Sequence, residues 1–259
     1  MLGSITGIET LHWWNPSGVQ NVVIGGTAAG NGNEIAGHLD SGISVANTFS
    51  GVRITGNSIH DNGGIGIDLV TPLFENGVTP NDPLDADSGG NGLQNFPVLT
   101  SASGTGANTT VQGSLNSLAN QAFTLEFFVN PMCGPTGYGQ GKAYLGAATV
   151  TTGSTGNATF SATLPGSVAA DSVITATATQ NSTGNTSEFS ACITSVVVPN
   201  PAGDIDGNGL VNVTDADLFV AVLLGNNSNT QQVDRSDLNH DGLEDGRDVS
   251  PFVAALLGG

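Results

Sequence analysis

The end of the chain contains two copies of one twelve-residue pattern, which constrain its fold more than any other feature. The first copy begins at Asp204 and the second at Asp237, 33 residues later. Each has an oxygen-bearing side chain at positions 1, 3, 5, 9 and 12, and a glycine at position 6. A loop with this spacing supplies the six to eight oxygens, at about 2.3–2.6 Å, that Ca²⁺ prefers. The sequence therefore predicts two calcium-binding loops.

The predicted ligands are the side chains at those five positions and the main-chain carbonyl at position 7. In the first loop they are Asp204, Asp206, Asn208, Leu210, Asn212 and Asp215. In the second loop they are Asp237, Asn239, Asp241, Leu243, Asp245 and Asp248. The glycine permits the positive φ of a sharp turn. An apolar segment ending in Leu-Leu-Gly follows each loop and predicts a helix.

These duplicated loop–helix units resemble a type I dockerin. A standard EF-hand usually has Glu at position 12 and a helix on each side of the loop. This chain instead has Asp at position 12, and Asn-Pro-Ala-Gly precedes the first loop. The resemblance covers Asp204 to Gly258. It implies a module, residues 199–259, that folds on two Ca²⁺ ions like a half EF-hand and binds a cohesin module of another protein.

The helices of this module are expected to bind the partner. Their packing against each other is predicted to use Phe219, Val222, Leu223, Phe252, Ala255 and Leu256. The apolar residues left over predict a surface that either binds a partner or packs on the neighbouring domain. Family contacts usually include Ser or Thr at loop positions 10 and 11 and basic residues on the helix, from which this chain departs. The corresponding residues here are Val213, Thr214, Val220, Ala221, Gly246, Arg247, Val253 and Ala254.

Charge and apolar patterning exclude some partners. The net charge is −18, with only four lysines and arginines, too few to neutralise a nucleic-acid backbone. The longest apolar runs are too short to span a membrane. The first residues do not have the features of a signal peptide, yet such calcium loops suit the calcium-rich exterior. We therefore expect an extracellular or bacterial cell-surface protein, with Met1 inside a longer secreted chain or at a misplaced gene start.

Short β-branched runs separated by Gly and Asn recur every 7–12 residues from about Val19 to Leu69. This spacing predicts stacked coils of a parallel β-helix. Residues 56–69 resemble the last coils of large bacterial right-handed β-helix surface proteins, so residues 1–98 are expected to be such coils with an acidic connecting segment. Trp13 and Trp14 either pack on the end of the solenoid or form a platform on which carbohydrate stacks.

The acidic connecting segment is a further candidate metal site. It contains Asp82, Asp85 and Asp87 within residues 81–91. Carboxylates at this spacing either bind one more Ca²⁺ or form a solvated cluster in a turn.

Residues 99–198 contain six or seven alternating apolar and polar runs, the last of which includes residues 187–190, and these runs predict an antiparallel β-sandwich. The resemblance of the preceding coils implies that this sandwich is immunoglobulin-like. Cys133 follows one predicted strand and Cys192 lies in the last, so they either form a disulfide or are free buried thiols. The predicted fold is thus mainly β with a small α-helical C-terminal module.

Pectate lyases and polygalacturonases also have β-helices, so catalysis must be considered. Lyases need a basic proton acceptor, and hydrolases need paired carboxylates. The coil region contains Arg53, His38, His60, Asp61 and Asp68, and no lysine. Adjacent residues of a strand point to opposite faces, so His60 is expected to be an exposed turn residue that does not act with Asp61. No catalytic residues are predicted.

The sequence therefore predicts a non-catalytic secreted or cell-surface modular protein that docks onto a cohesin-like partner through a calcium-binding module. One alternative is a fragment of a polysaccharide-active β-helix lyase or hydrolase whose catalytic coils lie upstream. The other is an adhesin whose coils bind glycans, such as a cell-surface or plant-type polysaccharide.

Overall fold

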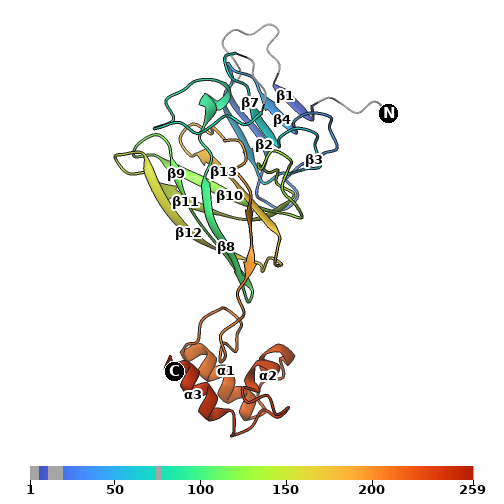
Figure 1. The fold of residues 1–259 in the computed structure, drawn as a ribbon, viewed down its shortest axis with the longest axis vertical. Helices are drawn as coiled ribbons and strands as arrows, with labels where there is room; N and C mark the ends of the chain where they lie inside the picture. The colour runs from blue at the N-terminus through green and yellow to red at the C-terminus, as the bar shows by residue number, and fades with distance from the viewer. Residues whose placement is uncertain (1–5, 11–19, 74–76, 259) are drawn as a thin grey trace.

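The structure, a computed structural model, describes residues 6–10, 20–73 and 77–258. These residues form a mainly β protein with its α-helices at the C-terminal end (Figure 1). None of the described helices has the length and apolar character that a membrane crossing requires. The predicted roles of Trp13 and Trp14 fall outside the described residues.

Short parallel strands form the N-terminal part, residues 6–10 and 20–73, which we call the parallel-strand region. They make three sheets: β1 (Ile8–Thr10), β4 (Ile43–Val45) and β7 (Ile67–Leu69); β2 (Gln20–Gly25) and β5 (Ser50–Thr55); β3 (Glu34–Ala36) and β6 (Ser58–His60). In the paired strands, isoleucine lies opposite isoleucine: Ile24 with Ile54, Ile35 with Ile59 and Ile43 with Ile67. Successive turns of the chain therefore stack one row of buried β-branched side chains on the next.

Two four-stranded sheets pack face to face in residues 98–197, which we call the two-sheet region (Figure 1). One sheet has the order β11 (Ala143–Thr151), β10 (Ala122–Asn130), β13 (Val173–Gln180), β14 (Ile193–Thr194). The other has the order β12 (Asn157–Pro165), β9 (Asn108–Asn116), β8 (Val98–Thr105), β15 (Val196–Val197). Side chains such as Val111, Phe123 and Ile174 fill the space between the sheets. The sheets thus share one core.

The segment after β13 differs from the prediction. Residues 187–190 were expected to form a strand, but they run beside β13 without a regular ladder. The hydroxyl oxygen of Ser187 accepts a hydrogen bond from the backbone N–H of Ala178 at 2.9 Å. The hydroxyl of Ser190 does the same for Ala176 at 3.0 Å. Because side-chain oxygens replace main-chain carbonyls here, the regular strand does not form.

The outer edge of the last turn of parallel strands is closed by side chains from later in the chain. Five backbone N–H groups on this edge donate hydrogen bonds to side-chain oxygens. The pairs are Gly51 to Asn185 (2.6 Å), Val52 to Asn91 (2.9 Å), Ile54 to Thr186 (2.9 Å), Gly56 to Glu126 (3.0 Å) and Leu69 to Glu188 (2.9 Å). Asn91 lies in the 3₁₀ turn η1 (Gly90–Leu93) of the connecting segment, and the other acceptors belong to the two-sheet region. Since buried N–H groups are costly when unpaired, these contacts join the two β regions into one unit.

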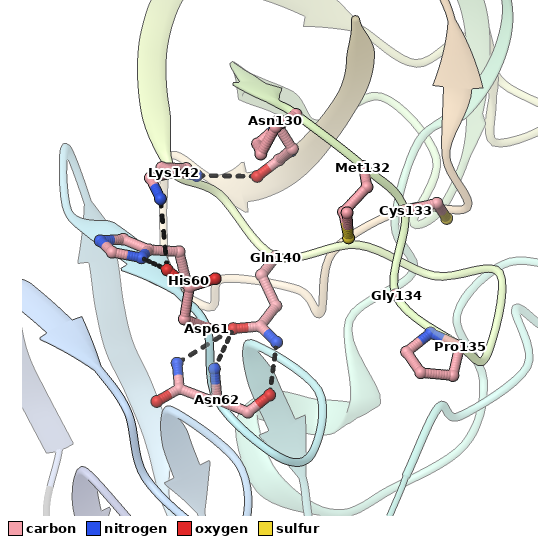
Figure 2. Close-up of a pocket in the computed structure, with 11 residues that line it drawn as sticks. His60, Asp61, Asn62, Asn130, Met132, Cys133, Gly134, Pro135, Gln140 and Lys142 are labelled. Atoms are coloured by element: carbon pink, nitrogen blue, oxygen red, sulfur yellow. Dashed lines mark hydrogen bonds and ion pairs between the residues drawn. The ribbon is translucent and has the colours of Figure 1, made fainter.

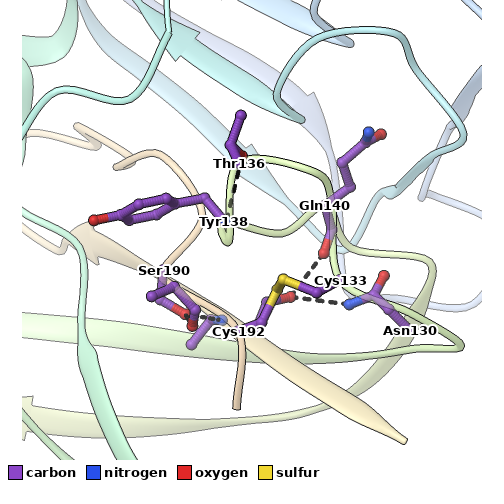
Figure 3. The surroundings of a disulfide bond; sticks show 10 residues. Asn130, Cys133, Thr136, Tyr138, Gln140, Ser190 and Cys192 are labelled. Atoms are coloured by element: carbon purple, nitrogen blue, oxygen red, sulfur yellow. Dashed lines mark hydrogen bonds between the residues drawn. A yellow bond between two sulfur atoms is a disulfide. The ribbon is translucent and has the colours of Figure 1, made fainter. Parts of the chain in front are cut away.

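The loop between β10 and β11 makes a second connection to the parallel strands. Its Gln140 side chain donates hydrogen bonds to the carbonyls of Asn62 and Gly64, at 2.9 and 3.1 Å. Cys133, near the start of this loop, forms a disulfide with Cys192, just before β14 (Figure 3). The disulfide therefore ties the loop to the last strand of the same sheet.

Three helices form the C-terminal part, residues 199–258, which we call the helical module: α1 (Val213–Leu223), α2 (Thr230–Ser236) and α3 (Val249–Leu256). The rings of Phe219 and Phe252 stack with their centroids 4.4 Å apart, and Ile205 packs with them. The sequence did not predict α2, which ends immediately before Asp237. The second loop consequently has a helix on both sides.

Candidate metal centres

Loop 1, residues 204–215, folds around the carboxylate of its first residue. The oxygens of Asp204 accept hydrogen bonds from the backbone N–H groups of loop positions 4, 5 and 6, at 2.9, 3.0 and 2.8 Å. Gly209, at position 6, has a φ of 90°, so the chain can turn sharply there. Asp204 is thereby buried inside the turn, with 2% of its surface exposed.

The last residue of loop 1 closes the loop and begins α1. Asp215 is fully buried and accepts the backbone N–H groups of positions 2, 3 and 9, at 2.8, 3.0 and 2.9 Å. With Asn212 it also forms the capping box of α1. Oxygens of Asp204, Asp206 and Asp215 lie within 4.8 Å of one another. Three predicted ligands therefore meet at one point.

Loop 2, residues 237–248, repeats most of these hydrogen bonds. Asp237 accepts the N–H groups of positions 5 and 6, at 3.1 and 2.9 Å. Asp248 accepts those of positions 2, 3 and 9, at 2.9, 3.0 and 2.9 Å. Only positions 1, 6, 7 and 12 carry the same residue in both loops. The two loops thus share one backbone path despite eight differences between their twelve residues.

The two loops differ in their electrostatic environment. Burial raises the pKa of Asp204, because desolvation disfavours its charge more than the N–H groups favour it. Desolvation also acts on Asp248, but there the backbone N–H donors outweigh it and lower the pKa. A cation beside Asp204 would offset the cost of keeping this carboxylate charged and buried.

The donor chemistry of both loops fits Ca²⁺. Every predicted side-chain ligand is a carboxylate or an amide, so each loop offers hard oxygen donors. At position 7, the side chains of Leu210 and Leu243 point into solvent, with 67% and 57% of their surface exposed. These leucines contribute little packing, which is consistent with the predicted use of their main-chain carbonyls.

The three carboxylates of the connecting segment also gather, with oxygens of Asp82, Asp85 and Asp87 within 4.8 Å of one another. Burial raises the pKa of Asp85 to about 6, and the charges of Asp87 and Asp82 add to the effect. Both oxygens of Asp85 accept hydrogen bonds, from the N–H of Asn95 at 2.9 Å and the hydroxyl of Ser117 at 2.6 Å. This cluster is the candidate for the third predicted Ca²⁺, and the hydrogen bond from Ser117 also joins the segment to the residue that follows β9.

The residues predicted to contact a partner lie on the outside of the helical module. Seven of the eight are exposed, and Ala221 is half-buried. Val220 and Val253 expose 51% and 44% of their surface. Leu224 and Leu257, which the sequence did not single out, expose 67% and 79% at the ends of α1 and α3. Apolar surface is therefore exposed at equivalent points of both repeats.

One His–Asp pair lies in a pocket between β6 and the β10–β11 loop (Figure 2). The ring Nδ1 of His60 lies 2.7 Å from a carboxylate oxygen of Asp61, and the histidine side chain is only 14% exposed. The prediction of an exposed His60 facing away from Asp61 is wrong, because Asp61 has a φ of 54° and leaves the strand geometry. The hydrogen bond from His60, followed by that from Lys142, lowers the pKa of Asp61. Lys142 is 81 residues from Asp61 in the sequence, so no local signal could have found this contact.

Comparison with known proteins adds no assignment. No protein-family model matches the chain, and no curated protein matches it.

Proposed function

We propose that the helical module is a type I dockerin-like module that binds two Ca²⁺ ions and docks onto a cohesin-like module of another protein. The hydrogen bonds shared by the two loops carry this proposal, above all those that the carboxylate at position 12 accepts from positions 2, 3 and 9. In loop 1 they accompany three carboxylates whose oxygens lie within 4.8 Å. A divalent cation would remove the repulsion among these charges and stabilise the fold.

In the same proposal, the two β regions form the part of the protein that carries the helical module. Isoleucine stacked on isoleucine at three positions supports the last coils of a right-handed parallel β-helix. Two facing sheets with one core support an immunoglobulin-like β-sandwich. A disulfide is typical of secreted proteins. The chain is then a non-catalytic, secreted or cell-surface modular protein with its docking module at one end.

The metal sites are tested by Asp215→Ala and Asp248→Ala. Apart from any ion at Asp82, Asp85 and Asp87, which these variants leave unchanged, calorimetric titration of the full chain with CaCl₂ should find two sites in the parent, one in each variant and none in the double variant. Each substitution removes the carboxylate that closes its own loop. Asp61→Ala, which changes an acidic residue outside the loops, is the matched control and should retain two sites. Two sites in both single variants would show that the predicted ligands are misassigned.

Docking is tested with purified type I cohesin modules by surface plasmon resonance. The parent chain should bind in Ca²⁺ and release in EGTA. Val220→Asp/Val253→Asp should abolish binding, because it places charge on both helices of the apolar surface, whereas either single variant should still bind through the other repeat. Val98→Asp is the matched control, since Val98 and Val220 are equally exposed, at 51%. A double variant that binds as well as this control contradicts the proposal.

A further inference from the structure

The tip of the β8–β9 hairpin is directed toward the helical module (Figure 1). It contacts loop 1. The backbone N–H of Ala107 donates a hydrogen bond to the carbonyl of Gly207, at 3.1 Å. Gly106, beside it, has a φ of 56°, and a Cβ atom there would overlap the carbonyl oxygen of Gly207. The methyl group of Thr105 would lie 2.7 Å from a Cβ atom on Gly209. We call this set of interactions the hairpin contact.

The same residue of loop 1 connects the hairpin contact to the first predicted calcium ligand. The N–H of Gly207 donates to the carboxylate of Asp204 at 2.9 Å, while its carbonyl accepts from Ala107. Arg235 of α2 lies against the other side of Gly207 and donates to the carbonyl of Ile205 at 3.3 Å. Gly207 is thus enclosed by the rest of loop 1, the β8–β9 hairpin and Arg235.

Loop 2 has no such cover among the described residues. Its position 4 is His240, which is exposed, whereas Gly207 is buried. No atom lies within 4 Å of the place where Gly242 would carry a Cβ atom. The two loops are therefore alike in their internal hydrogen bonds and different in their surroundings.

We infer that the hairpin contact strengthens calcium binding at loop 1 and couples the occupancy of this loop to the packing of the helical module against the two-sheet region. This inference rests on the proposed calcium binding. The contact requires the folded path of loop 1, and calcium stabilises the same path, so each favours the other to an equal degree. One net hydrogen bond corresponds to about a two- to tenfold change in affinity. Loop 2, without this contact, responds only to its own ligands.

The test separates the two loops in the full chain. Of the two loop sites, Asp248→Ala leaves only loop 1, and Asp215→Ala leaves only loop 2. Gly106→Val, which forces the hairpin away from Gly207, should weaken CaCl₂ binding about two- to tenfold in the first background and leave the second unchanged. Gly30→Val is the matched control. Gly30 also has a positive φ, 82°, but a Cβ atom there meets nothing within 4 Å.

A second measurement tests whether the helical module stays packed against the two-sheet region. In Ca²⁺, small-angle X-ray scattering of the full chain should show a broader distribution of sizes for Gly106→Val than for the parent, while Gly30→Val should match the parent. Amide exchange of β8 and β9 confirms that the variant is folded. No calcium binding by the parent would overturn the proposed function. Calcium binding that Gly106→Val leaves unaltered in the loop 1 background, or alters equally in both backgrounds, would overturn the hairpin inference alone.

Discussion

The β regions and the helical module bury different kinds of side chain. Each β region has an extensive apolar core, whereas the buried apolar residues of the helical module are Ile205, Phe219, Val222 and Phe252. The module also buries the carboxylates of Asp204, Asp215 and Asp248. Buried charges destabilise a fold unless they are compensated. The comparison indicates that apolar packing stabilises the β regions, whereas the module combines a small apolar core with buried carboxylates, as the proposed calcium binding would require.

Removal of calcium should break this comparison most completely. In EGTA, peptides from residues 204–258 should lose their amide-exchange protection, because the module has too little core to offset the repulsion of its carboxylates. Peptides from the β regions should retain theirs. Hydrogen–deuterium exchange of the full chain, measured by mass spectrometry in Ca²⁺ and in EGTA, tests the expectations for the module and for the β regions in one experiment. A module that remains protected in EGTA contradicts the proposed role of the metal.

Removal of the disulfide should act on the β regions alone. The bond joins residues 59 apart, and a closure of this length contributes about 4 kcal/mol in the chain-entropy account. Cys133→Ser/Cys192→Ser should therefore lower the unfolding free energy of the β regions by up to about this amount. Guanidinium denaturation followed by circular dichroism measures it. The control is Met132→Ser, because Met132 lies beside Cys133 and is 75% exposed; it should change the unfolding free energy little. The disulfide variant should leave the calcium affinity of the helical module unchanged.

pH should affect the two regions in opposite directions. Burial raises the pKa of Glu188 from 4.5 to about 8, and the nearby charge of Asp68 adds to the rise. The folded state therefore holds a proton that the unfolded state loses, and this contribution to β-region stability falls by about 1.4 kcal/mol per pH unit between those values. In the module, the lowered pKa of Asp248 gives a contribution that is present above its ordinary value of 3.8 and is lost as pH falls through the folded value.

Urea denaturation of the β regions across this pH window measures the first effect. Glu188→Gln should reduce the slope, because an amide does not titrate. A parent chain whose β-region stability is flat or rises from pH 4.5 to pH 8 would contradict the assignment to Glu188.

The features that the sequence predicted are those encoded in local spacing. The predicted ligands Asp204 and Asp215 fall into one cluster because the twelve-residue spacing itself determines the loop. The parallel strands were predicted because their β-branched residues alternate with Gly and Asn at nearly constant intervals. By contrast, α2 is short and has no apolar periodicity. Its only local signal is the N-cap Asn229, which accepts the N–H groups of two following residues.

The contacts that sequence reasoning missed join residues far apart in the chain. Glu188 receives the N–H of Leu69 from 119 residues away, and Glu126 receives that of Gly56 from 70 residues away. In the sequence, these glutamates stand in segments that otherwise read as ordinary strands. Only the docking of one β region on the other makes them buried acceptors. The hairpin contact with loop 1 has the same non-local origin.

The closed edge of the parallel strands also bears on self-association. A strand edge with free N–H groups is a template on which another chain can add a strand, the first step toward filaments and aggregates. Here Asn91, Glu126 and Glu188 accept such N–H groups through their side chains. Side-chain carboxylates and amides end a ladder, because they offer no backbone for a further strand to pair with. A further chain therefore finds these N–H groups already paired and cannot use them to add a strand.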